Sequence, residues 1–206
     1  MAKSKAGRTR WKRFGLALVP GVVIISGLTM AAANGAIPMS FAISGTAFKV
    51  SGDHMEATNV VQYGSVAGTK GGKDDAKPNI LSGFQHAEFT NLCQSVKVPL
   101  PFSILGHDSV VMVIKSGGTA TAENMIADLA QLTGDATFKG VDIGIDAQAT
   151  TKGPLAGTAP KPGMFGQQVD KVIVEHPRQT VYAVSAETFR LPSLDLSVNF
   201  DNQECF

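Results

Sequence analysis

Two short segments place a glutamate two residues after a histidine, a spacing that could serve metal binding. They are His54-x-Glu56 and His86-x-Glu88. Residues two apart in a strand point to the same face. On neighbouring strands, these four side chains would therefore offer two imidazoles and two carboxylates to a metal ion. The alternative needs no metal, because cross-strand His–Glu and Thr–Thr pairs stabilise a solvated sheet face by themselves. We favour the alternative and predict neither a metal nor a cofactor.

Catalytic motifs are scarce. His107-Asp108-Ser109 contains the three residue types of a hydrolytic triad, but adjacent residues seldom converge in that geometry. Gly64–Gly68 contains Ser65 without the spacing of a nucleophile elbow. The sequence also lacks a phosphate-binding loop, a His-Glu-x-x-His zinc motif and a Cys-x-x-Cys pair. We therefore favour a protein that is not an enzyme, with Ser109 and Ser65 as the candidate nucleophiles of the alternative, a lipid-ester hydrolase.

The His-x-Glu pairs belong to a longer repeat. The segments 54–62 and 86–94, offset by 32 residues, share His, Glu, Thr, Asn and Gln at the same places, and weaker copies occupy 119–126 and 185–189. Repetition at this period predicts one structural unit used several times. In a strand, Met55 and Ala57 would form the apolar face, opposite His54 and Glu56. Asn59, like Asn91 in the second copy, is placed where a strand could bend, because asparagine tolerates left-handed backbone.

Most of the remaining chain alternates apolar and polar residues with period two, which predicts an all-β body. Thr119–Gly134 fits a helix or a strand, and its alignment with the repeat favours the strand. Val110–Ile114 is wholly apolar and predicts a buried strand. A β-solenoid, a curved open sheet and a sandwich all fit this pattern. The other predicted strands are 39–50, 80–98, 136–148 (half-buried through Val141, Ile143 and Ile145), 167–175, 180–189 and 194–200, and the predicted loops are 67–79 and 150–163.

Pro99–Gly106 is apolar but contains two prolines, so we predict neither a strand nor a helix there. It could lie as a loop over one end of the core. Alternatively, it could form an apolar lip that contacts lipid or a partner. The side chains that would make this contact are Leu100, Phe102, Ile104 and Leu105.

The N-terminus has the features of a membrane leader. Residues 1–13 hold six basic residues and no acid, and residues 14–33 carry no charge. The positive-inside rule then places residues 34–206 outside the cytoplasm. The apolar stretch is long enough for a retained transmembrane anchor, yet Ala31–Ala33 also suits signal-peptide cleavage and secretion. Without the six basic residues the chain has 12 basic and 17 acidic side chains, a net charge of −5, which argues against nucleic-acid binding.

The chain contains two cysteines, Cys93 within the second repeat and Cys205 next to the C-terminal residue. Outside the cytoplasm such a pair most simply forms a disulfide. The bond would attach the tail to a repeat strand. The other interpretation is two free thiols.

Several segments also resemble a known family. They are Arg10–Phe14, Ser40–Ala42, Leu92–Val96, Gly134–Phe138, Phe165–Gln168 and Thr188–Val198. Together they resemble an uncharacterised family of actinobacterial envelope proteins, common in streptomycetes, whose members often carry the label cholesterol esterase. The resemblance implies a multi-pass membrane protein as a partner and brings no catalytic or binding residues.

We therefore expect a membrane-anchored, extracytoplasmic β-domain that acts as a binding or structural subunit, with lipid as a candidate ligand. A self-assembling envelope protein, which would form homo-oligomers, is a further alternative.

Overall fold

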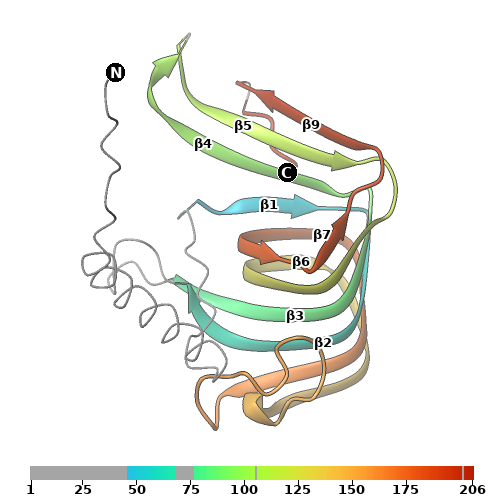
Figure 1. Ribbon diagram of the computed structural model, residues 1–206. Helices are drawn as coiled ribbons and strands as arrows, with labels where there is room; N and C mark the ends of the chain where they lie inside the picture. The colour runs from blue at the N-terminus through green and yellow to red at the C-terminus, as the bar shows by residue number, and fades with distance from the viewer. Residues whose placement is uncertain (1–45, 68–76, 105, 201) are drawn as a thin grey trace, which may run out of the picture. The chain divides into compact units, whose positions relative to one another are not determined.

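The computed structural model describes residues 46–67, 77–104, 106–200 and 202–206. The predicted leader (14–33) and the first part of the strand predicted at 39–50 lie outside these residues. Nine strands make up most of the described chain (Figure 1). They are β1 Phe48–Ser51, β2 His54–Ala67, β3 Lys77–Thr90, β4 Cys93–Ile104, β5 His107–Ser116, β6 Ala120–Asp146, β7 Phe165–Ser185, β8 Thr188–Arg190 and β9 Leu194–Asn199, with a 3-10 turn η2 at Ala147–Ala149.

All nine strands belong to one antiparallel sheet in the order β8-β6-β3-β2-β7-β1-β4-β5-β9. The 27-residue β6 pairs with β3 near its start and with β7 over most of its length. Since β2 also pairs with both β3 and β7, the strands β2, β3, β6 and β7 form a closed ring. The all-β prediction is confirmed, and so is the strand predicted at Thr119–Gly134.

The long strands bend where residues adopt left-handed backbone. Asn59 on β2 and Asn124 on β6 both have φ of 47°, and the register places them beside Gln85 of β3. A second bend follows Asn91, with φ of 52°, and β7 bends at His176, with φ of 50°. The predicted bends at Asn59 and Asn91 are therefore confirmed, and the third repeat copy bends at its own asparagine.

The repeat copies 54–58 and 86–90 lie on neighbouring strands and run antiparallel. His54 faces Thr90, and Ala57 faces Ala87. The two faces of this part of β2 are as predicted, since Met55 and Ala57 are buried while His54 and its polar neighbours are partly exposed. The copies thus cover one core together, but their histidines lie at opposite ends of the paired segment.

The main core lies inside the ring, and three alanines lie side by side in one of its layers. Ala57, Ala87 and Ala122 are side by side on β2, β3 and β6, and all three are fully buried. The same row ends at Phe138 on one side and Phe189 on the other, and both rings are partly exposed. Alanines allow the bent strands to approach closely, while larger side chains close the row at its two ends.

The predicted loop at 150–163 is present and covers a second, smaller core. Leu155 lies against Gly83, where an added Cβ would come within 3.0 Å of the leucine side chain. Tyr63 contacts the same loop through its hydroxyl, 3.1 Å from Oγ1 of Thr158. The loop therefore acts as a lid on β2 and β3. Its buried cluster consists of Val61, Tyr63, Ile126, Ala147, Leu155 and Ala159.

The C-terminal tail is held against β1 and β4. Cys93 and Cys205 form the expected disulfide, with Cα atoms 5.8 Å apart. The backbone amide of Cys205 donates to Oγ of Ser95 at 3.0 Å, and Lys49 pairs with Glu204 at 2.8 Å. The tail therefore packs on one face of these strands.

Three predictions of local structure are wrong. Pro99–Ile104 continue β4 instead of forming a loop, with a register irregularity between these two residues. Met112 is exposed within the strand predicted to be buried. Val141 and Ile143 are also exposed, because this half of β6 pairs with β7 alone and the described chain has no layer over it.

Candidate functional site

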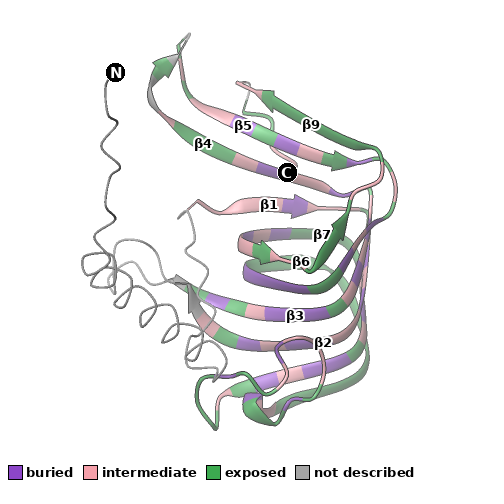
Figure 2. Cartoon of the chain, in the orientation of Figure 1, coloured by how far each residue is buried: buried purple, intermediate pink, exposed green. Residues whose placement is uncertain are grey.

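The strands β4, β5 and β9 extend beyond the ring, and we call these three strands the wing (Figures 1 and 2). One face of the wing carries a row of exposed apolar side chains. Directly paired residues share a face, and Val96 of β4, Met112 of β5 and Val198 of β9 form one such row. Val198 is 63% exposed and Leu196 is 58% exposed. The apolar residues of this face are Val96, Val98, Val110, Met112, Ile114, Leu194, Leu196 and Val198, which we call the wing face.

The wing face continues the apolar side of the core. Val50 is buried in the main core and pairs with Gln94, which in turn pairs with Ile114. Phe48 also packs on the core and lies on the same side of β1. The apolar layer of the core therefore continues onto the wing face, where the described residues no longer cover it.

The opposite side of the wing is different in character. Val111 and Val113 are buried there, and Ser95 accepts the hydrogen bond from the tail. The described residues thus pack one side of the wing and leave the other side apolar and exposed. Burial of a Val, Leu or Met side chain contributes roughly 1.5–3 kcal/mol, so an uncovered row of this kind is a strong driving force for association.

The His-x-Glu residues form ion pairs on the outer surface of the ring. Nδ1 of His54 lies 2.9 Å from Glu175, while His86 contacts Glu123 at 2.6 Å and Glu88 at 3.1 Å. The hydrogen bonds that the carboxylates of Glu88 and Glu123 accept from the His86 ring raise the pKa of the imidazole. His54 and His86 therefore contact different carboxylates.

Glu56 lies directly opposite Glu88, and a hydrogen bond from Lys171 lowers the pKa of its carboxyl group. The four residues of the metal alternative, His54, Glu56, His86 and Glu88, therefore share a face without converging. No group of three His, Cys, Asp or Glu side chains in the described part of the chain is arranged to hold a metal ion. This face can act as a charged, salt-bridged surface.

The candidate nucleophiles have no catalytic partners among the contacts of the described residues. Ser109 donates a hydrogen bond to Oδ1 of Asn202 at 3.3 Å. His107 stacks on Phe200, with ring centroids 4.9 Å apart. Ser65 lies near the end of β2. The structure thus brings together no base and nucleophile from the residues that the hydrolase alternative requires.

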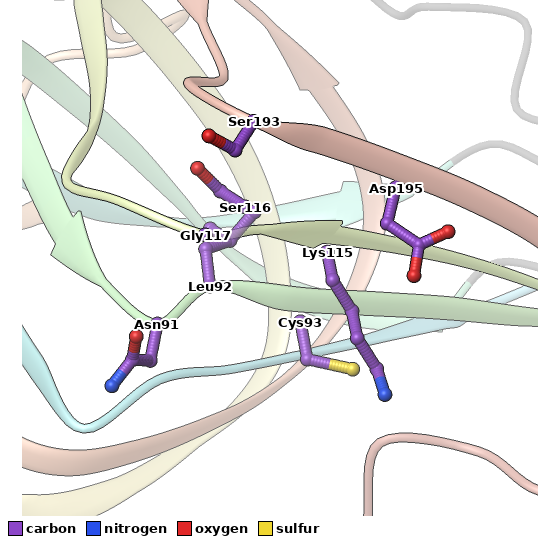
Figure 3. Close-up of a pocket in the computed structure, with 8 residues that line it drawn as sticks. All are labelled: Asn91, Leu92, Cys93, Lys115, Ser116, Gly117, Ser193 and Asp195. Atoms are coloured by element: carbon purple, nitrogen blue, oxygen red, sulfur yellow. The ribbon is translucent and has the colours of Figure 1, made fainter.

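An open hollow of about 400 Å³ lies where β4, β5 and β9 begin or end (Figure 3). Ser116 donates to the backbone oxygen of Pro192 at 2.9 Å, so its hydroxyl already has a structural role. Lys115 lies between Cys93 and Asp195 in the register of the wing. A shallow site with one lysine, one aspartate and a disulfide offers little catalytic chemistry. Its lining is Asn91, Leu92, Cys93, Lys115, Ser116, Gly117, Ser193 and Asp195.

Three of the predicted contact residues lie on the last part of β4, beyond Val98 of the wing face. Leu100 is half-buried on β4, and Phe102 and Ile104 belong to the same strand. Leu105 lies outside the described residues. Sequence reasoning did not single out the apolar face of β9, although the alternation of Leu194, Leu196 and Val198 was visible. That pattern predicted a strand with an apolar face. It did not predict that the face would be exposed.

Comparison with known proteins identifies the family but no activity. A family model matches residues 44–206, a range that includes all of the described residues. The chain belongs to the family of unknown function DUF6230. No curated protein and no solved structure matches the chain. The expected resemblance to an uncharacterised family is therefore confirmed, while the actinobacterial source and the esterase label come from the resemblance alone.

The described part of this DUF6230 chain contains no helix that is both long and apolar enough to span a bilayer. Its strands carry the charged face on the ring and the wing face on β4, β5 and β9. Of these two surfaces, the second has no partner within the described chain.

Proposed function

We propose that this protein is a non-enzymatic binding or structural subunit at the outer side of a membrane, and that its wing face docks on an apolar surface of a membrane protein. The observation that carries the proposal is the open row of Met112, Leu196 and Val198, continuous with the core. A protein domain rarely leaves such a row uncovered unless it binds something.

Two further observations support the location. The basic segment 1–13 and the charge-free residues 14–33 fit a membrane anchor with the body outside. The Cys93–Cys205 disulfide fits an oxidising compartment. A cleaved leader would give the same body as a secreted protein, and the wing face would then meet its partner from solution.

Photo-crosslinking in the native membrane tests this proposal. A photoreactive amino acid replaces Met112, which lies on the wing face, or Lys97, which is exposed on the opposite side of the wing. We expect adducts to one membrane protein from position 112 and none from position 97. Adducts to lipid alone would make lipid the occupant of the wing face. Absence of adducts at position 112, or equal adducts at both positions, would contradict the proposal.

A further inference from the structure

The sheet has a second unsatisfied feature, the outer edge of β9. Among the described strands only β5 pairs with β9, so the other side of its backbone is open. An open strand edge exposes N–H and C=O groups that can pair with another strand. Proteins usually protect such edges with charges, prolines, bulges or short strands.

The other long edge, on β6, is protected. Asp135, Lys139 and Asp142 carry charges along it, and its pairing with β7 is interrupted by several register shifts. Three glycines with positive φ also bend it, namely Gly134, Gly140 and Gly144. This edge has the features that prevent another strand from adding to it.

The β9 edge has few such features. Leu194–Asn199 contains one charged residue, Asp195, and no proline, glycine or lysine. Its pairing with β5 runs through six consecutive residue pairs without a shift. A regular, mostly uncharged and partly apolar edge is suited to adding a strand.

We infer that β9 pairs antiparallel with β9 of a second copy of this chain, with Ser197 on the twofold axis. In this register Ser197 faces itself, Leu196 faces Val198 of the second copy, and Asp195 faces Asn199. The apolar side chains of both copies then share one face, and no like charges meet. The two wings join into one continuous sheet, and the interface is isologous, as expected for a twofold dimer.

Neighbouring registers fit less well. Centring the pair on Asp195 sets two carboxylates against each other. Centring it on Leu196 brings in Ser193, whose φ of 50° marks the bend before the strand. If the twofold axis falls between two residues instead of on one, apolar residues face polar ones. The apolar face is then divided between the two sides of the sheet. The axis at Ser197 avoids all three problems.

This inference goes beyond the proposed function, because it uses the backbone edge and leaves the wing face open for a partner. The dimer would present two wing faces side by side. The two proposals can fail separately, since Ser197 points to the opposite side of the sheet from Leu196 and Val198.

Cysteine crosslinking of the full chain, purified in mild detergent, tests the register. Opposed strand residues have the Cα separation that a disulfide needs. We expect Ser197→Cys to give a reducible dimer on mild oxidation. Asp195→Cys is the matched control, because its two copies would be about 14 Å apart along the strands. Equal crosslinking of the two variants, or none at Ser197→Cys, would overturn the inference.

Charge substitution tests the dimer without an added thiol. We expect the unmodified chain to have twice the mass of one 21.5 kDa chain in light scattering corrected for detergent. Ser197→Lys places two ammonium groups on the axis, so that variant should have the mass of one chain. Mixing it with Ser197→Glu should restore the dimer and show that both variants are folded. A monomeric unmodified chain, or a Ser197→Lys variant that stays dimeric, would overturn the inference.

Discussion

Asn59 donates a hydrogen bond from Nδ2 to Oε1 of Gln85 at 2.5 Å, while its own backbone bends β2 with φ of 47°. A residue with a Cβ in this conformation costs roughly 1–2 kcal/mol, and asparagine is among the few that adopt it readily. We expect Asn59→Ala to lower the free energy of unfolding by about 1–2 kcal/mol. Asn59→Gly should lose less, because glycine adopts this backbone without strain.

Denaturant unfolding of the three proteins measures the difference. Equal losses in the alanine and glycine variants would mean that the side-chain hydrogen bond matters and the backbone conformation does not.

The lid loop depends on a glycine that touches β2. Gly153 has φ of 71°, and an added Cβ would lie 2.6 Å from the backbone oxygen of Asn59. Because a backbone atom cannot move aside easily, we expect Gly153→Ala to lower the melting temperature clearly. Gly64→Ala is the control, since its Cβ would meet no atom within 4 Å. If both variants melt alike, the lid does not pack on β2 as described.

The contacts of His86 predict a pH dependence. Hydrogen bonds that the carboxylates of Glu88 and Glu123 accept from its ring raise its pKa in the folded protein. Its contribution to stability is therefore complete below the usual histidine pKa and is lost as the pH rises through the raised value. We expect His86→Gln to be less stable than the unmodified protein at pH 5.5 and to differ from it less at pH 8.5. Melting curves at the two pH values check this, and a difference that grows with pH would contradict the assignment.

The packing of the C-terminal tail on the wing should depend on the Cys93–Cys205 disulfide. Cys93 and Cys205 are 112 residues apart, and closing a loop of this length contributes roughly 4–5 kcal/mol in the chain-entropy model. We expect the variant with both cysteines replaced by serine to lose a large part of this amount. Hydrogen exchange should also become faster at the buried Val111 and Val113, because the tail leaves their side of the wing. Unchanged exchange there would show that the Lys49–Glu204 ion pair and the hydrogen bond from the amide of residue 205 to Ser95 hold the tail without the disulfide.

Local pattern was enough to predict some of these features. Alternation predicted the strands, and the repeated asparagine predicted the bends at Asn59 and Asn91, because both depend on neighbouring residues alone. The disulfide between Cys93 and Cys205 was predictable because the chain has two cysteines, which allow one pairing.

Other features depend on contacts between distant segments, and the sequence did not reveal them. The closure of the ring by β6 and β7 is one such feature. Alternation at Val141 and Ile143 showed an apolar side but not the lack of a covering layer. The same is true of Leu196, so the wing face became visible only when the strand order was known.

The measurement that tests the central claim most directly is thiol labelling of two adjacent positions on β4. Val98 is 42% exposed on the wing face, and Lys97 is exposed on the other side. If the wing face docks on a membrane protein, a maleimide should label Val98→Cys slowly in native membranes and quickly after detergent separates the partners. Lys97→Cys should be labelled at the same rate in both. Fast labelling of Val98→Cys in native membranes would show that the wing face is uncovered there and would contradict the account.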